Sequence, residues 1–336
     1  MIRKDLFTNY FEMVYADIPT FGKAPMAQYA ELAEVDIAVF GIPWDATATL
    51  RAGARLGPRG IREQSIWFHE VWNPQSTPLI GFGQPRSRLK DRISMVDCGD
   101  ITIWPGNINK TSESIRKAAA SIAQIAFPIM LGGDHYVMFP TYQGVCDAHP
   151  GKIVGIVQID AHNDLIDDDP IYGTHWSGTP IRRSLEHAGV SSGILSQIGL
   201  RGFIGRSERE FQLANDIKVI SLVEFRKIGP IEAARHAMES VLRNCDIVYL
   251  TIDIDSVDPS CAPGCSTPVP GGLLADEFVS LLRALGEYRE IVALDIVEVA
   301  PPLDPTHQTT LLAAHGLFGF IEERFLLEPT RLRKGE

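Results

Sequence analysis

The sequence predicts a three-layer α/β/α fold with a mostly parallel central sheet of roughly eight strands. Short apolar runs bounded by Gly, Pro or Asp recur along the chain. Most of them are continuously apolar, as strands covered on both faces are. Segments with apolar residues at three- and four-residue spacing, a pattern typical of amphipathic helices, fall between several of these runs. This alternation of strands and helices continues over the whole length, which indicates an α/β domain.

The predicted elements follow in chain order. The candidate strands are the apolar runs at 35–43, 93–101, 127–134, 153–160, 196–202, 217–225, 246–255 and 291–299. Helices are predicted over 112–126, 231–244 and 275–288, where the apolar spacing is clearest. Asp276 is the expected N-cap of the last helix, with Glu277 in its first turn.

The chain is expected to divide into three parts of unequal size. Residues 1–34 read as an irregular N-terminal extension with an early helix or loop, and residues 327–336 as a solvated tail. Between them, residues 35–326 are expected to form a single α/β catalytic domain, because we find no linker, internal repeat or low-complexity tract there.

Composition excludes several classes of partner. The 336 residues are 45% hydrophobic and 22% charged, which is ordinary for a globular protein. The net charge of -11 disfavours nucleic acid. No apolar run reaches the roughly 18 residues of a membrane span, and the start lacks the apolar core of a signal peptide. A cytoplasmic protein with reduced thiols is therefore predicted, with five scattered cysteines: Cys98, Cys146, Cys245, Cys261 and Cys265.

Metal-type ligands follow three of the predicted strands. One run ends in Gly-Gly-Asp-His, the next in an Asp-x-His-x-Asp pattern, and a third carries Asp-x-Asp. In an extended chain, residues at every second position lie on one face. Functional groups of α/β folds gather where the carboxyl ends of the strands open out. The six candidate ligands are His135, Asp160, His162, Asp164, Asp253 and Asp255.

The charges of these residues favour a metal centre over a structural role. Each piece alone also has a structural interpretation, as a helix cap, a turn or a satisfied core histidine. Together, however, four buried aspartates would repel one another unless positive charge lies among them. Two divalent ions would contribute a charge of +4, against -4 from the four aspartates and -1 from a bridging hydroxide. Oxygen and imidazole ligands suit Mn(II), Ni(II) or Fe(II). Dinucleotide, P-loop and serine-hydrolase motifs are absent from the sequence.

Longer motifs around these ligands resemble a known family. GGDH, DAHND and DIDSVDPSCAPGCSTPVPGG resemble the three signatures of the ureohydrolase (arginase/agmatinase) family. The segments at 40–65 and 294–305 are similar to the N-terminal and C-terminal segments of that family. The resemblance covers roughly residues 35 to 325 and indicates an agmatinase-like member with an atypical substrate loop.

The resemblance implies a binuclear site, usually manganese and otherwise nickel, that hydrolyses a guanidinium group to urea and an amine. One ion would be held by His135, Asp160, Asp164 and Asp253. The other would be held by Asp160, His162, Asp253 and Asp255, so that Asp160 and Asp253 bridge. Metals lower the pKa of bound water and so supply hydroxide at neutral pH. Asp164 would orient the hydroxide and protonate the leaving amine, and Glu298 would pair with the guanidinium.

Three positions near this site depart from the family pattern. Tyr136 follows GGDH, where the family has a small residue. Two residues separate His175 from the glycine of the family's His-Gly-Thr-Pro, which puts the proton-shuttle role of this histidine in question. The family's Gly-Thr-Gly-Thr-Pro appears here as Gly264-Cys265-Ser266-Thr267-Pro268, which is the third departure. Trp176 is expected to line the pocket and stack on a planar cation, whereas Tyr136 and Cys265 also suit simple packing. Tyr136, Trp176 and Glu298 are the predicted substrate contacts.

The loop after the second motif bears on the substrate. It reads LIDDDPIYG, and Asp167, Asp168 and Asp169 would repel an α-carboxylate if they faced the pocket, although a solvated acidic turn is the simpler interpretation. A small cationic guanidino compound is therefore expected: agmatine, guanidine, a methylated guanidine or a biguanide rather than arginine. Two alternatives remain, a formimidoylglutamase-like amidine hydrolase and a non-catalytic subunit that partners an active paralogue. The resemblance further implies a homo-oligomer, trimeric or hexameric.

Overall fold

The predicted parallel sheet is present in the computed structural model, which describes residues 18–32, 35–68, 93–189 and 192–326. Eight strands lie in the order β2-β1-β3-β8-β7-β4-β5-β6, and every neighbouring pair is parallel. Each of the eight predicted runs overlaps one strand. Their bounds are β1 Ile37–Gly41, β2 Met95–Asp100, β3 Phe127–Leu131, β4 Val154–Ile159, β5 Leu195–Ile198, β6 Lys218–Ile220, β7 Ile247–Asp253 and β8 Ile291–Val297.

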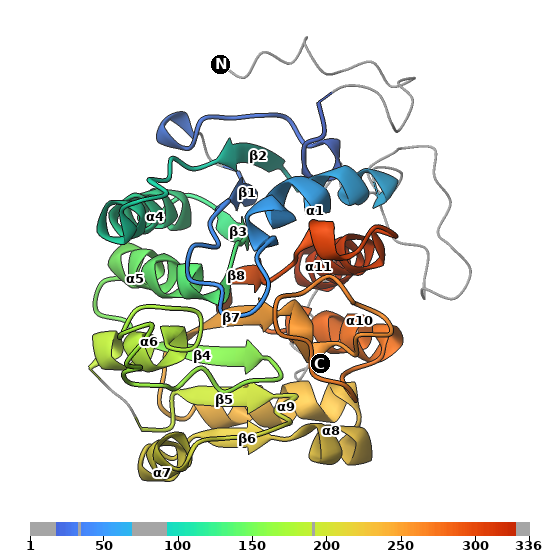
Figure 1. The fold of residues 1–336 in the computed structure, drawn as a ribbon. Helices are drawn as coiled ribbons and strands as arrows, with labels where there is room; N and C mark the ends of the chain where they lie inside the picture. Colours follow the sequence, from blue (N-terminus) through green and yellow to red (C-terminus); the bar gives the residue numbers. More distant parts are fainter. Residues whose placement is uncertain (1–17, 33–34, 69–92, 190–191, 327–336) are drawn as a thin grey trace, which may run out of the picture.

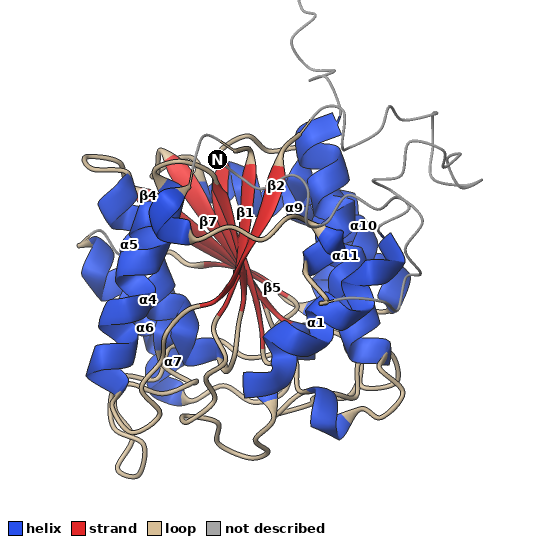
Figure 2. Cartoon of the chain, turned by 90° about the horizontal axis from the view of Figure 1, so that it is seen from above, coloured by secondary structure: helices blue, strands red, loops and turns tan. Residues whose placement is uncertain are grey.

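Helices cover both faces of this sheet, so the three-layer prediction is confirmed (Figure 1). Seen from above, α4, α5, α6 and α7 lie on one side and α1, α9, α10 and α11 on the other (Figure 2). None of the described helices is both long and apolar enough to span a bilayer. The helices are α1 Gly57–Ser65, α4 Ile108–Ala123, α5 Met138–Ala148, α6 Pro180–Ala188, α7 Arg206–Ala214, α8 Leu222–Ile228, α9 Pro230–Val241, α10 Ala275–Gly286 and α11 Gln308–Leu326.

The strand predicted over 217–225 is only partly correct. Strand β6 ends at Ile220, and the residues that follow form helix α8. Ser221 is the N-cap of this helix, and its hydroxyl accepts a hydrogen bond from the Glu224 N–H at 3.2 Å. Such a cap satisfies one of the free N–H groups at a helix start and therefore ends the extended chain.

The cap predicted for helix α10 is wrong. The helix begins at Ala275, so Asp276 lies inside its first turn and Leu274 occupies the N-cap position. Glu277 supplies the stabilising contact instead, accepting a hydrogen bond from the Leu274 N–H at 2.8 Å. Both carboxylates still lie at the positive end of the helix dipole, where negative charge is favourable.

The described part of the N-terminal extension is tied to the domain. Phe21 is fully buried and stacks on Phe318 of α11 with ring centroids 5.0 Å apart. Its N–H donates to the Asp97 carboxylate at 2.7 Å, and that carboxylate also pairs with the buried Arg62 of α1. Residues 18–32 thus pack as part of the fold, whereas the predicted tail lies outside the described residues.

Strand order explains why distant motifs meet. The four neighbours β3, β8, β7 and β4 lie in the middle of the sheet. Their registers align the strand ends, with Leu131 opposite Ile296, Asp253 opposite Val297, and Ile159 opposite Ile252. Because all four strands are parallel, their carboxyl ends meet at one edge, where α/β folds place their functional groups.

Candidate metal centre

The first group of candidate ligands surrounds His135, in the short turn between β3 and α5. Its Nδ1 lies 2.8 Å from Asp164 Oδ2 and 3.2 Å from both Asp160 Oδ2 and Asp253 Oδ2. All four side chains are buried, yet this ring nitrogen has no hydrogen-bond partner among the described residues. Donor atoms that crowd together without bonding one another are arranged as ligands around a cation. His135, Asp160 and Asp253 form one possible metal-binding group.

A second group shares Asp160 with the first. His162 Nδ1 lies 3.0 Å from Asp255 Oδ2 and 3.6 Å from Asp160 Oδ1, and these three residues form another possible metal-binding group. Asp160 therefore turns one oxygen toward each group, as a bridging carboxylate does. The His162 side chain is 37% exposed, whereas Asp160 and Asp255 are fully buried. Solvent thus reaches the centre from the His162 side.

The buried carboxylates of this centre would also be stabilised by positive charge among them. Burial raises the pKa of Asp253 well above its usual range, and the charges of Asp255 and Asp160 add to the effect. Burial lowers the pKa of His162, but the carboxylates of Asp255 and Asp160 outweigh it and raise the pKa to about 12. The carboxylates therefore stabilise any cation among them. A pair of divalent ions would meet this demand, and the oxygen and imidazole donors fit Mn2+ or Ni2+.

Glu298 lies beside the first group with one oxygen free. It follows β8, and its Oε1 accepts a hydrogen bond from the His135 N–H at 2.8 Å. Its side chain is almost completely buried, but Oε2 has no hydrogen-bond partner within the part of the chain that the structure describes. Burial and the charge of Asp134 raise the pKa of this carboxyl well above its usual range. A buried carboxylate oxygen without a donor is a ready acceptor for the N–H groups of a guanidinium.

Two of the predicted catalytic residues have strained backbones. Asp164 has φ of 50° and Glu298 has φ of 62°, in the left-handed region that non-glycine residues seldom occupy. Each such conformation costs on the order of 1–3 kcal/mol and persists only where surrounding contacts impose it. In Glu298 the N–H donates to Gly133 O at 2.8 Å, which ties the strained residue to the motif that carries His135.

Three buried polar residues that the sequence analysis missed orient His135. Its Nε2 lies 3.0 Å from the Thr251 hydroxyl, which donates to Asp295 Oδ1 at 2.7 Å. The Tyr249 hydroxyl donates to the other oxygen of Asp295. With Nε2 protonated and donating, Nδ1 is left unprotonated toward the carboxylates, as a metal ligand requires. The signal was available in the sequence, as polar residues inside the apolar runs of β7 and β8.

Replacing Thr251 with valine should weaken metal binding without emptying the site. The change removes the acceptor of His135 Nε2 while keeping the shape of the side chain, so the imidazole loses its orientation. Loss of such a contact typically costs 10- to 100-fold in metal affinity, roughly, and we expect that range for Mn2+. Calorimetric titration of metal-stripped protein measures the effect. Thr111→Val, at a buried threonine bonded to Trp104, is the matched control and should bind Mn2+ normally.

The structure places Tyr136 and His175 in an aromatic cluster. Tyr136 is buried, and its hydroxyl lies 3.0 Å from Ser112 Oγ on α4. The His175 ring packs 6.0 Å from the rings of Tyr136 and Phe139. His175 makes no hydrogen bond, ion pair or ring contact with a candidate ligand in the described part of the chain. These contacts agree with a packing role for Tyr136, and its contact with the substrate stays a prediction.

Trp176 lies in a loop that is tied to the centre. This residue is 8% exposed, and the centroid of its ring lies 5.0 Å from that of Tyr172. Its Nε1 has no hydrogen-bond partner in residues 18–32, 35–68, 93–189 and 192–326. The neighbouring Ser177 hydroxyl donates to Thr47 O at 3.2 Å, and Thr47 in turn donates to the carboxylate of Asp134. These contacts connect the Trp176 loop to the residue that precedes His135.

The segment that contains Cys265 supports the second group. Thr267 donates to Asp255 Oδ2 at 3.1 Å, a contact that sequence reasoning missed. Cys265 itself is buried, and its carbonyl accepts a hydrogen bond from Arg51 at 2.6 Å. Burial raises the pKa of its thiol above the usual range, so the thiol stays protonated at neutral pH. These contacts agree with a packing role for Cys265.

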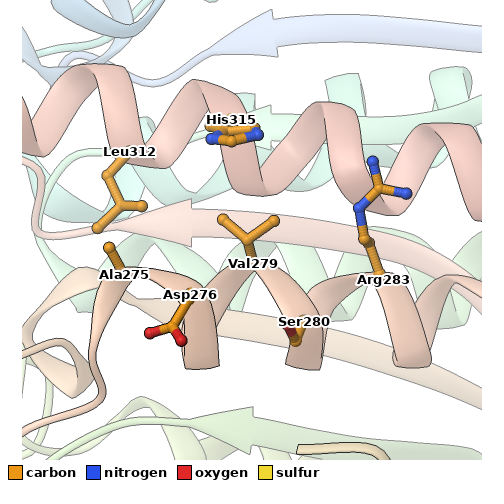
Figure 3. Close-up of a pocket in the computed structure, with 7 residues that line it drawn as sticks. All are labelled: Ala275, Asp276, Val279, Ser280, Arg283, Leu312 and His315. Atoms are coloured by element: carbon orange, nitrogen blue, oxygen red, sulfur yellow. The ribbon is translucent and has the colours of Figure 1, made fainter. Parts of the chain in front are cut away.

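A separate cavity lies away from the predicted site. It has a volume of about 510 Å³ between α10 and α11, and Figure 3 shows its lining residues on these two helices. The walls include Val279, Leu312 and His315, and none of the predicted site residues is among them. The candidate centre therefore depends on the ligand groups at the strand ends and not on this cavity.

Comparisons with known proteins agree with this architecture. The sequence model of the arginase family matches residues 35–321. Proclavaminate amidinohydrolase of Streptomyces clavuligerus is 32% identical, over 89% of this chain and 90% of that protein, and its solved structure superposes with a TM-score of 0.81 at 30% identity, over 93% of this chain and 99% of that one.

Two further relatives are similarly distant. Guanidinopropionase of Pseudomonas aeruginosa is 32% identical, over 90% of this chain and 91% of that protein. Agmatinase of Chromobacterium violaceum is also 32% identical, over 93% of this chain and 90% of that protein. The family match spans most of the chain and includes every candidate ligand. The chain belongs to the arginase family.

Proposed function

We propose that this chain is a binuclear-metal hydrolase that converts a guanidino compound into urea and an amine. Members of its family such as agmatinase and guanidinopropionase hydrolyse C–N bonds, which gives the class of reaction. The observation that carries the proposal is the pair of ligand groups that share Asp160, beside the unpartnered oxygen of Glu298. Together they would hold two cations and receive a third, the guanidinium.

The proposed ligand sets are those that the sequence suggested. Two Mn2+ or Ni2+ ions would be held by the six residues of the two groups, and they would supply hydroxide at neutral pH when bound. Asp164 Oδ2 lies 2.8 Å from His135 Nδ1 and belongs with the first group. Asp253 also lies in that group, and its other oxygen accepts from the Asp255 N–H at 2.8 Å, so it connects the two groups as a second bridge would.

The chain's own residues would bind the substrate and move a proton. Glu298 Oε2 would accept the N–H fork of the guanidinium and hold its carbon near the ligand groups. Asp164 lies in the first group, 2.8 Å from His135 Nδ1, and its carboxylate would carry a proton to the leaving amine. The contacts of His175 favour a role in supporting the Trp176 loop over that of a proton shuttle.

We propose agmatine or a compact guanidine as the substrate in preference to arginine. Trp176 lies in the loop after Asp164 and would limit the length of the substrate that the site accepts. The acidic loop supports the preference less strongly than its composition suggests, because Asp167 is exposed and pairs with Arg183 and Arg182 of α6. Because these arginines offset the charge of Asp167, the loop would repel a substrate carboxylate less. Together with the likeness to guanidinopropionase, this supports a second candidate substrate, a short ω-guanidino acid.

Urea release from reconstituted protein tests the proposal. The chain alone, loaded in parallel with Mn2+ and Ni2+, would be offered agmatine, arginine, 4-guanidinobutyrate, guanidine, N,N-dimethylguanidine and metformin. We expect urea from agmatine or a short guanidine and little from arginine. Formamide from formimidoylglutamate would instead establish the amidine-hydrolase alternative. Protein that binds both ions but releases neither product would contradict the proposal and favour a non-catalytic subunit.

The proposed oligomeric state follows from the family and not from a contact in this chain. We propose a homo-oligomer, trimeric or hexameric. The alternative is a hetero-oligomer that contains a paralogue. Light scattering on the purified chain measures its mass in solution. Activity of the chain alone would show that a paralogue is unnecessary, whereas activity that appears only on mixing would favour the alternative.

Replacing Trp176 with alanine should change the order of substrates by length. Removing a large buried ring opens space, so longer substrates such as agmatine should gain relative to guanidine. A change of about tenfold in the ratio of the two kcat/KM values is expected, since apolar pocket contacts are worth about 1–3 kcal/mol. Trp67→Ala, at a tryptophan that is 69% exposed, is the control. An unaltered ranking in Trp176→Ala would exclude this residue from length selection.

A further inference from the structure

Three buried glutamines connect helix α7 to the carboxylate shared by the two ligand groups. Gln212 on α7 donates to Gln197 Oε1 at 2.6 Å, and Gln197 on β5 donates to Gln158 Oε1 at 2.6 Å. Gln158 on β4 then donates to Asp160 Oδ2 at 2.7 Å. The three side chains are at most 2% exposed. We call this chain of side-chain amides the glutamine relay.

The direction of the relay is fixed at both ends. Asp160 offers only acceptors at one end, so the NH2 group of Gln158 must face it. At the outer end, Arg209 offers only donors, and its guanidinium donates to Gln212 Oε1 at 3.2 Å. Every amide therefore donates toward the metal centre. Aligned amide dipoles polarise one another, and their positive ends point at the carboxylate.

The inner two glutamines also hold the backbone that carries the ligands. The second N–H of Gln158 donates to His162 O at 3.3 Å, and that of Gln197 donates to Asn163 O at 2.9 Å. Both protons of each amide are thus in use. The relay fixes the side chain of Asp160 and the chain just after it, which carries His162 and leads to the strained Asp164.

Polar side chains are not needed to fill space in this apolar layer, so the glutamine relay is expected to hold another group in position. Gln158 and Gln197 are register partners on neighbouring strands, and Ile156 and Leu195 are partners two residues earlier. A second aliphatic pair would fill the same space without needing hydrogen bonds. Each buried amide that loses its partner costs about 1–3 kcal/mol, so the three members depend on one another. Losing a hydrogen bond at the outer end of the relay would therefore also weaken the hydrogen bond to Asp160.

We propose that the glutamine relay positions Asp160 as the bridging ligand of the metal pair, so that helix α7 supports the centre from the protein surface. Gln158, Gln197 and Gln212 act here as positioning residues that touch neither substrate nor metal. This inference rests on the proposed function, since it requires that Asp160 bridge two ions.

The relay can be broken without touching a ligand. Gln197→Met keeps the size of the side chain but leaves Gln158 Oε1 and Gln212 Nε2 unpaired. We expect at least one Mn2+ to bind about 10- to 100-fold more weakly, the usual range for contacts behind a ligand. Calorimetric titration measures both affinities, and the electron paramagnetic resonance spectrum of the loaded protein reports the coupling through the bridge. That coupling should change, and kcat should fall more than KM rises.

Ser196→Ala is the matched control on the same strand. Ser196 is fully buried, and its hydroxyl donates to Ala237 O at 3.0 Å rather than to a relay glutamine in the described part of the chain. It should lower thermal stability while leaving the Mn2+ affinities and the spectrum unchanged. Gln212→Met, at the outer end, should act in the same direction as Gln197→Met but less strongly. It also decides the question if Gln197→Met fails to fold.

The possible outcomes separate the relay from the proposed function. If the wild-type chain binds two Mn2+ ions and both relay variants bind them with wild-type affinity and spectrum, the relay serves only packing and the inference is overturned. If the wild-type chain binds no pair of ions, the proposed metal centre is overturned, and the relay loses its role with it.

Discussion

Asp160→Asn should lower turnover by on the order of 10⁴-fold, which corresponds to about 5 kcal/mol in the activation barrier. Asp160 turns one oxygen toward each ligand group, so the change removes negative charge from both groups at once. The asparagine amide can present an oxygen to only one of them. We therefore expect at least one metal ion to be lost, as measured by metal analysis after dialysis alongside the rate of urea release.

A surface aspartate provides the control for this change. Asp147 on α5 pairs with Arg116 at 2.6 Å and is well exposed, so Asp147→Asn makes the same chemical change outside the centre. It should keep two ions and normal turnover. Asp160→Asn protein that retained both ions and wild-type activity would show that this carboxylate does not bridge them.

Glu298→Gln should separate substrate binding from metal binding. The amide can still accept the His135 N–H through its oxygen, as Glu298 Oε1 does at 2.8 Å. The unpartnered Oε2, however, becomes an NH2 group that repels the N–H donors of a guanidinium. Loss of a charge-assisted bidentate contact should lower kcat/KM about 100-fold, or about 2.7 kcal/mol, with two ions still bound.

Glu239→Gln is the corresponding control for Glu298. Glu239 is an exposed glutamate on α9 that pairs with Arg235 at 2.8 Å, so neutralising it should leave kcat/KM unchanged. If Glu298→Gln turned over the best substrate with wild-type kcat/KM, the guanidinium would have to bind elsewhere. If it lost metal instead, Glu298 would support the ligand groups rather than the substrate.

The sheet and the clustering of the candidate ligands were predictable because their signals are local. Each strand is a continuous apolar run, and the ligands follow at strand ends with the two-residue spacing of extended chain. Helices were harder to predict. Helix α5 contains Pro140 and Gly144, which obscure its pattern, and Gly144 is required because a Cβ there would approach Arg116 O to 2.4 Å. Helix α11 is apolar on most sides, so no single face stands out.

The support behind the ligands could not be predicted from spacing. Thr251 and Asp295 lie 44 positions apart, and Gln158 and Gln197 lie 39 apart, so only the strand order and register bring them together. The same limit applies to charge. The acidic loop suggested repulsion of a carboxylate, but Asp167 pairs with Arg183, which lies 16 positions further along the chain. The relative positions of residues within one motif can be predicted from the sequence. Contacts between residues of different elements can be identified only once the fold is known.

The most direct test of the binuclear centre is anomalous X-ray diffraction from crystals of the Mn2+-loaded protein. Two peaks should appear at the strand ends, one among His135, Asp164 and Asp253, and the other beside His162 and Asp255. Asp160 should lie between the two peaks, with one oxygen toward each. A single peak, or two peaks that Asp160 does not join, would contradict a binuclear centre bridged by this carboxylate.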